Sequence, residues 1–216
     1  MDLDEPAAHA SPPRSVPNEI RPPSPADVAL LIAKATAADP ALGAFLRLAA
    51  STGARRSQLL ALRWKDVDLE RRRISFTRAL VEGPTGPVLA PTKARRAYQV
   101  SLDVDTAAFL AQHRSCRDRL ADSFVFSHDT DGATPWKPNW VTSAFIRLRR
   151  DTGIPRCRLH DLRHFMATEM LAAGVAIPIV AARLSHARAS TTLNVYAHAV
   201  PGGDRAAAEA LADLLR

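Results

Sequence analysis

The spacing of apolar residues in this chain changes from a helical period to a strand-like period at about residue 73, and returns to a helical period after residue 102. Before the change, Ser24-Pro25-Ala26-Asp27 has the features of a helix N-terminus: a capping serine, a proline at the first helical position and an acid in the first turn. We therefore predict helices from there to about residue 38, from 40 to 51 and from 55 to 63.

The central segment predicts a small antiparallel sheet. Residues 74–77, 88–90 and 98–102 follow the two-residue period of strands, and a Gly/Pro-rich turn precedes the second of them. The predicted fold class is mainly α with a small three-stranded antiparallel β-sheet (α+β). Gly174 is expected to stop one of the later helices, and Pro178 to lie in the first turn of the next. Those helices are predicted at about 103–113, 138–150, 160–173, 177–185, 190–197 and 203–215.

The N-terminal 24 residues differ from the rest of the chain. They contain six prolines and too little apolar content to offset the entropy of ordering, so we expect a disordered tail or linker at 1–24 and one domain at 25–216. Cys116 and Cys157 lack the spacing of a disulfide framework or a metal site. No apolar run approaches the roughly 20 residues that cross a bilayer, and a cytoplasmic location is expected.

The charge of the chain favours a polyanionic partner only slightly. The formal net charge is +7, and removal of the acidic N-terminal segment leaves +9 on the remainder. However, 25 of the 29 cations are arginine and alanine is abundant, which a GC-rich coding sequence also produces. Because the chain has only four lysines, a lysine at a chemically useful position is the more informative cation.

Residues suited to attack on a phosphodiester occur in order along the chain. Arginine forks neutralise the phosphate and stabilise charge in the transition state, and His160 and Arg163, three apart on a helix, face the same side. A tyrosine nucleophile forms a phosphotyrosyl ester that conserves the energy of the broken bond. With arginines supplying the positive charge, no metal or other cofactor is expected. The candidate residues are Arg55, Lys93, His160, Arg163, His186 and Tyr196.

Each candidate has a role in this hypothesis. Arg55, Arg163 and His186 bind phosphate oxygens, Lys93 protonates the leaving 5′ oxygen, and His160 accepts the proton of Tyr196.

Other residues of similar type are given simpler interpretations. His160 and His164 have the four-residue spacing of a metal pair, but no third ligand or His-Glu-x-x-His pattern accompanies them, so His164 is interpreted as structural. His198 either points into the site or caps a helix, and the sequence leaves both open. Tyr98, Trp64 and Trp136 are interpreted as packing residues.

The candidate residues fall within sequence blocks that resemble the catalytic domain of the tyrosine recombinases, the phage integrase family. The resemblance covers about residues 25–200 and implies site-specific strand exchange through a 3′-phosphotyrosyl intermediate, with double-stranded DNA as partner. It also implies a monomer in isolation and a homotetramer on DNA, in which the helix at 203–215 docks on a neighbour, and leaves room for accessory DNA-binding proteins. The blocks are Thr52-Gly53-Ala54-Arg55, Leu59 to Asp68, Thr92-Lys93, His160-Asp161-Leu162-Arg163-His164 with Ala167-Thr168, Leu184-Ser185-His186, and Tyr196-Ala197-His198.

The chain departs from the family pattern in several places. It has Gln58 in place of a glutamate, Ser185 in place of a glycine, and Phe165-Met166 in place of Thr-Phe. The family's N-terminal core-binding domain, which closes a clamp on the duplex, is expected to be absent, because a proline-rich segment stands in its place. Two explanations stay open: a truncated or engineered catalytic fragment, or a natural gene that lacks the clamp. We therefore expect weak DNA binding, since the clamp's phosphate contacts would be missing.

Two other functions use related features. A type IB topoisomerase shares the phosphotyrosyl chemistry but relaxes one duplex, and a catalytically idle module would use the scaffold for DNA binding alone. The short spacing from His186 to Tyr196 favours the recombinase, and the complete set of six candidates argues against an idle site.

Overall fold

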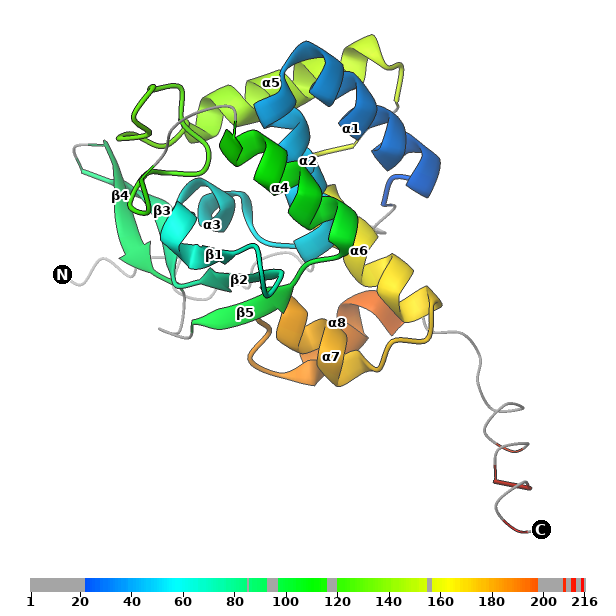
Figure 1. The fold of residues 1–216 in the computed structure, drawn as a ribbon. Coiled ribbons are helices and arrows are strands. Elements are labelled where there is room, and N and C mark those ends of the chain that lie inside the picture. The colour runs from blue at the N-terminus through cyan, green and yellow to red at the C-terminus, as the bar shows by residue number, and fades with distance from the viewer. Residues whose placement is uncertain are drawn as a thin grey trace, which may run out of the picture.

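The structure of the protein is a computed structural model that describes residues 22–84, 86–92, 97–115, 120–154 and 157–197, with single residues at 208, 211, 212 and 215 (Figure 1). Most of the predicted tail at 1–24 and most of the predicted helix at 203–215 lie outside the described residues, as do Lys93, Cys116 and His198. Among the described residues, none of the helices has both the length and the apolar character needed to cross a membrane.

The N-terminal part is helical, as predicted. Helix α1 (Pro25–Ala38) begins with a capping box, in which the Asp27 backbone N–H donates to the Ser24 hydroxyl at 3.1 Å and the Ser24 N–H donates to the Asp27 carboxylate at 3.2 Å. Asp39 then caps α2 (Pro40–Thr52). These side chains satisfy N–H groups that a helix start leaves unpaired.

Helix α3 (Arg56–Leu60) ends three residues before its predicted end. The following backbone is used elsewhere: the Leu62 carbonyl accepts from the Val125 N–H at 2.9 Å, and Arg63 forms an isolated antiparallel bridge with Phe124. The short 3₁₀ helix η2 (Trp64–Asp66) follows. Long-range pairing therefore overrides the local helical pattern here.

A three-stranded antiparallel sheet is present, in agreement with the predicted fold class, but its strands differ from the prediction. The sheet contains β1 (Val67–Asp68), β2 (Arg73–Phe76) and β5 (Tyr98–Ser101) in that order. The predicted strand at 88–90 instead belongs to β4 (Gly86–Pro91), which pairs with β3 (Arg78–Gly83) as a separate hairpin. The tight connection between these two strands favours this local pairing over one with the sheet.

The C-terminal helices lie within a few residues of their predicted positions. Gly174 ends α6 in the left-handed conformation with φ +79°, and Val175 donates to the carbonyl of Met170, as in a Schellman cap. Pro178 lies in the first turn of α7, as predicted. The helices are α4 (Val104–Ser115), α5 (Pro138–Asp151), α6 (Asp161–Ala172), α7 (Ile177–Arg183) and α8 (Ala189–Tyr196).

The buried apolar residues form two clusters. The larger joins helices α1 to α5 with the sheet and contains Trp64 and Trp136, each 2% exposed, which confirms their prediction as packing residues. The smaller lies where α7 and α8 pack beside α6 at one end of the molecule (Figure 1). Helix α6 contributes buried residues to both clusters. The candidate residues on α6 therefore lie between the main core and α8. The smaller cluster contains Met166, Ala167, Leu171, Val180, Leu184 and Tyr196.

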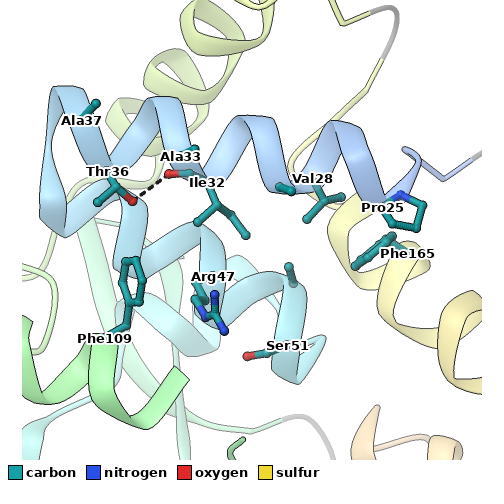
Figure 2. A pocket seen from close by; sticks show the side chains of 12 residues that line it. Pro25, Val28, Ile32, Ala33, Thr36, Ala37, Arg47, Ser51, Phe109 and Phe165 are labelled. Atoms are coloured by element: carbon teal, nitrogen blue, oxygen red, sulfur yellow. Dashed lines mark hydrogen bonds between the residues drawn. The ribbon is translucent and has the colours of Figure 1, made fainter. Parts of the chain in front are cut away.

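An apolar groove of about 650 Å³ runs between α1, α2 and α4, with Phe165 of α6 at one end (Figure 2). Phe109 and Ile32 lie on its walls, and Arg47 is its one charged lining residue. The Arg47 guanidinium is already paired, since it donates to the Thr106 hydroxyl at 3.2 Å and to Asp103 at 3.4 Å. None of the predicted site residues that the structure describes lines this groove, and the candidate chemistry lies in a different cavity.

Candidate active site

The junction between α2 and α3 brings the backbone close to α6. Thr52 donates its hydroxyl hydrogen to the Leu48 carbonyl at 2.6 Å and accepts from the Ala54 N–H at 3.2 Å. Gly53 follows with φ +65°, and a Cβ at this position would lie 2.1 Å from the Met166 methyl carbon. Only glycine fits this conformation and contact without rearrangement, because any other residue adds a Cβ and strains the backbone.

The backbone of Arg55 is held by Gln58, one of the departures from the family pattern. The Gln58 side-chain oxygen accepts from the Arg55 backbone N–H at 3.0 Å and from the Tyr98 hydroxyl at 3.0 Å. A glutamate oxygen would accept the same two bonds, so the substitution keeps the framework and removes a negative charge beside the arginine. Tyr98 also stacks on Phe76, with ring centroids 5.2 Å apart, in agreement with its predicted packing role.

Arg163 is a buried cation at the centre of the site, with 4% of its surface exposed. Its guanidinium donates to the Gly53 carbonyl at 2.6 Å, to the Leu184 carbonyl at 2.7 Å and to the His186 Nε2 atom at 3.1 Å. Burial, together with the nearby charge of Arg55, lowers the pKa of Arg163 to about 10, so the group stays protonated at neutral pH. Arg163 thus ties the α2–α3 junction to the end of α7.

The end of α7 presents both a carbonyl and a histidine to Arg163. Ser185 adopts φ +52°, its N–H donates to the Ala182 carbonyl at 2.9 Å, and the His186 N–H donates to the Ala181 carbonyl at 2.9 Å. This is a Schellman cap with serine at the position that favours glycine. The chain turns sharply there, so the Leu184 carbonyl and the His186 ring both reach Arg163.

The hydrogen bonds of His186 define its tautomer. Arginine has only donors, so Nε2 accepts from Arg163, and the ring hydrogen resides on Nδ1, which lies 2.8 Å from the Thr192 hydroxyl. Burial and the charges of Arg163 and Arg55 lower the pKa of His186 to about 4. His186 is therefore neutral at physiological pH and is held between α6 and α8.

Several of the candidate residues line one cavity of about 440 Å³. Arg55, His160 and Arg163 share its wall with Arg56 and Arg158. Arg158 pairs with the buried Asp161 carboxylate at 3.0 Å, whereas the hydrogen-bond partners of Arg163 are neutral. The cavity is therefore cationic and suited to an anion such as a phosphate.

His160 lies at the N-cap of α6, at the exposed edge of this cavity. Its pKa is lowered, first by burial of part of the ring and then by the charge of Arg163. A neutral imidazole beside bound phosphate can accept a proton.

Tyr196 is the last residue of α8 and is only 1% exposed. Its hydroxyl lies 2.7 Å from the Nδ1 atom of His164, the residue that follows Arg163 on α6. Burial raises the pKa of Tyr196, and the charge of Arg163 opposes that shift. The tyrosine therefore lies beside the cationic site, on the side of α6 that carries His164.

The sequence prediction gave His164 a structural role and did not anticipate which groups it contacts. The structure places its ring against both His160, with ring centroids 5.0 Å apart, and the candidate nucleophile. The sequence contained one signal for these contacts. Residues four apart share a helix face, so a side chain that approaches His160 also lies near His164.

The structure brings together five of the six candidates. Arg55, His160 and Arg163 line the cavity, His186 bonds Arg163, and Tyr196 contacts the residue next to Arg163. Lys93 lies outside the described residues. Within the part of the chain that is described, no group of three or more His, Cys, Asp or Glu is arranged to hold a metal ion.

Residues 25–201 match the sequence profile of the phage integrase family. The chain belongs to the phage integrase family. One family relative is the Tyrosine recombinase XerC-like protein of Caldanaerobacter subterraneus, 26% identical over 198 residues, with coverage of 80% of this chain and 49% of the relative. The putative prophage phiRv2 integrase of Mycobacterium tuberculosis is 30% identical, with coverage of 79% and 46%. The chain thus spans about half the length of the curated relatives it matches.

Solved structures of family members share the fold. The Tn1549 transposon integrase, in complex with transposon right end DNA, superposes with a TM-score of 0.77 at 21% identity, covering 91% of this chain and 67% of that one. The catalytic domain of bacteriophage HP1 integrase gives a TM-score of 0.64 at 21% identity, covering 88% and 95%. The predicted fold of a tyrosine recombinase catalytic domain is therefore confirmed.

Proposed function

We propose that this chain is the catalytic domain of a site-specific DNA recombinase that cleaves and rejoins strands through a 3′-phosphotyrosyl intermediate. The observation that carries the proposal is that Arg55, His160 and Arg163 line one cationic cavity, while Tyr196 bonds the residue next to Arg163. The match to the phage integrase family and the likeness to an integrase solved with DNA support the same function.

In the proposed reaction the scissile phosphate enters the cavity and lies between Arg55 and Arg163. Arg163 needs no reorganisation to meet the phosphate, because its guanidinium is already oriented by two backbone carbonyls. The Tyr196 oxygen forms a bond to phosphorus, its proton passes to His160, and the bond from phosphorus to the 5′ oxygen breaks. Lys93 gives the leaving oxygen its proton. The reverse sequence, with a new 5′ hydroxyl as nucleophile, rejoins the strand.

The experiment is incubation with a duplex nicked near the cleavage point, followed by a denaturing gel. Wild-type protein should give a covalent protein–DNA band, and Tyr196→Phe should give none. Arg163→Ala should lower the cleavage rate by a factor of about 100 or more, since loss of one donor to a developing charge costs about 3 kcal/mol. Arg71→Ala is a matched control: this exposed arginine pairs with Asp68 in the turn after β1, away from the cavity, and its loss should leave the rate unchanged.

Other outcomes would assign a different function. A covalent band with Tyr196→Phe would remove this residue as the nucleophile. Relaxation of a supercoiled plasmid without an inverted-repeat site would indicate a type IB topoisomerase. Specific DNA binding without a covalent band, under conditions where a related full-length integrase cleaves, would indicate a catalytically idle binding module.

The assembly proposed is a monomer in isolation and a homotetramer on DNA. An uncovered apolar stripe at the C-terminus supports it, since Leu211 and Leu215 are 59% and 85% exposed. With Ala208 and Ala212 they have the i, i+3, i+4, i+7 spacing of one helix face. Sedimentation with and without a DNA site tests this assembly. Leu211→Lys should leave the free monomer unchanged and weaken the DNA-bound tetramer.

A further inference from the structure

The hydroxyl of Tyr196 is not accessible to DNA in the conformation that the structure shows. The residue is 1% exposed and packs in the smaller apolar cluster with Met166, Val180 and Leu184. Attack on phosphorus requires the nucleophile in contact with the reacting atom and in line with the leaving group. The end of α8 must therefore shift before Tyr196 can react.

Two hydrogen bonds hold the buried face of α8. The Thr192 hydroxyl lies 2.8 Å from His186 Nδ1, and the Tyr196 hydroxyl lies 2.7 Å from His164 Nδ1. Thr192 and Tyr196 are one helical turn apart and are 0% and 1% exposed. The bond to His164 therefore fixes the last turn of the helix at the reactive atom itself.

The hydrogen bond between His164 and Tyr196 joins two neutral groups, an imidazole and a phenol. Burial, reinforced by the neighbouring His160, lowers the pKa of His164 to about 4, so the imidazole is neutral and can accept from the phenol. Burial also raises the pKa of Tyr196, so the proton stays on the tyrosine oxygen. The His164 tautomer with its ring hydrogen on Nε2 leaves Nδ1 free to accept from the Tyr196 hydroxyl.

We propose that His164 is a positioning residue that withholds the Tyr196 nucleophile. It binds the hydroxyl in a buried resting site, and the bond opens when the end of α8 moves toward a bound phosphate. The proposal rests on the proposed function in one respect, namely that Tyr196 is the nucleophile. The holding contact itself is a property of the free protein and is measured there.

The first test measures access to Tyr196 in the free protein. N-acetylimidazole acetylates accessible phenols, and peptide mass spectrometry resolves the two tyrosines of the chain, so Tyr98 is an internal standard. His164→Phe keeps a ring but has no acceptor, whereas His164→Asn keeps a polar atom near the position of Nδ1. His128→Asn, which changes an exposed histidine outside the site, is the matched control.

We expect His164→Phe to raise the acetylation rate of Tyr196 about fivefold or more, which corresponds to about 1 kcal/mol for one lost hydrogen bond. Tyr98 should not change, and His164→Asn and His128→Asn should behave like wild type. An unchanged rate at Tyr196, or an equal rise at Tyr98, would overturn the proposal, because the contact would then be ordinary packing. His164→Leu provides the same comparison if the phenylalanine variant does not fold.

The second test measures initial cleavage of the nicked duplex. A hold on the nucleophile predicts that His164→Phe cleaves faster than wild type and that His164→Asn restores the wild-type rate. Slower cleavage by His164→Phe would overturn the proposal, because removal of a hold cannot slow release. If no variant cleaves DNA, the proposed function fails while the acetylation result still decides the role of His164.

Discussion

Replacement of Ser185 by glycine should stabilise the protein. Ser185 has φ +52° at the end of α7, in the left-handed region where an L-residue brings its Cβ too close to the following carbonyl. That conformation destabilises the folded state by about 1–2 kcal/mol. Glycine also has more conformational freedom in the unfolded chain, which reduces the expected gain in stability by about 0.4–1 kcal/mol. We expect Ser185→Gly to raise the free energy of unfolding by about 0.5–1 kcal/mol. In a chain of this length that corresponds to a rise in Tm of about 1–4 °C.

Urea denaturation followed by circular dichroism, together with calorimetry, measures the effect. Ser185→Ala should bring little gain, because alanine keeps the Cβ. Arg72→Gly is a matched positive case, since Arg72 has φ +49° in the turn between β1 and β2. Ala182→Gly, within the regular part of α7, should instead lower the free energy of unfolding by about 0.5–1 kcal/mol.

One result would refute the reasoning. If Arg72→Gly stabilises the protein while Ser185→Gly destabilises it, the Ser185 side chain stabilises the folded state by more than its left-handed backbone conformation destabilises it. Cleavage activity should be retained in Ser185→Gly, because the Schellman bonds and the carbonyl that orients Arg163 belong to the backbone.

Gly53→Ala should lower the free energy of unfolding by about 2 kcal/mol or more, through its positive φ and its contact with Met166, and Met166→Ala in the same chain should recover part of the loss in a double-mutant cycle. Tyr98→Phe should cost about 1 kcal/mol in urea denaturation, because it removes the donor to the buried Gln58 oxygen. Stability should also fall as the pH drops from about 6.5 to about 4. In that window the unfolded chain protonates His164 and the folded chain, with its pKa lowered to about 4, does not. Urea titrations between these pH values should give a shallower pH dependence for His164→Asn than for wild type.

The sequence could predict most of the helices because their signals are local. The capping box at Ser24, the proline at position 40 and the glycine at position 174 each satisfy or end a helix within one turn, so neighbouring residues are enough to place them. Strand partners were less predictable. The strand at 88–90 has the same period whether it joins the sheet or a hairpin, and pairing energies between distant residues decide the choice.

The types of residue in the site were determined by the sequence, because the chemistry of a phosphodiester requires arginines, a nucleophile and proton carriers in some arrangement. Their geometry was decided by the tertiary structure. Arg163 gains its orientation from Gly53 and Leu184, which are 110 and 21 residues away in the chain. The pairing of Tyr196 with His164, and the burial that hides the hydroxyl, depend on how α8 packs against α6. No local pattern contains that information, because contacts across the fold position these groups.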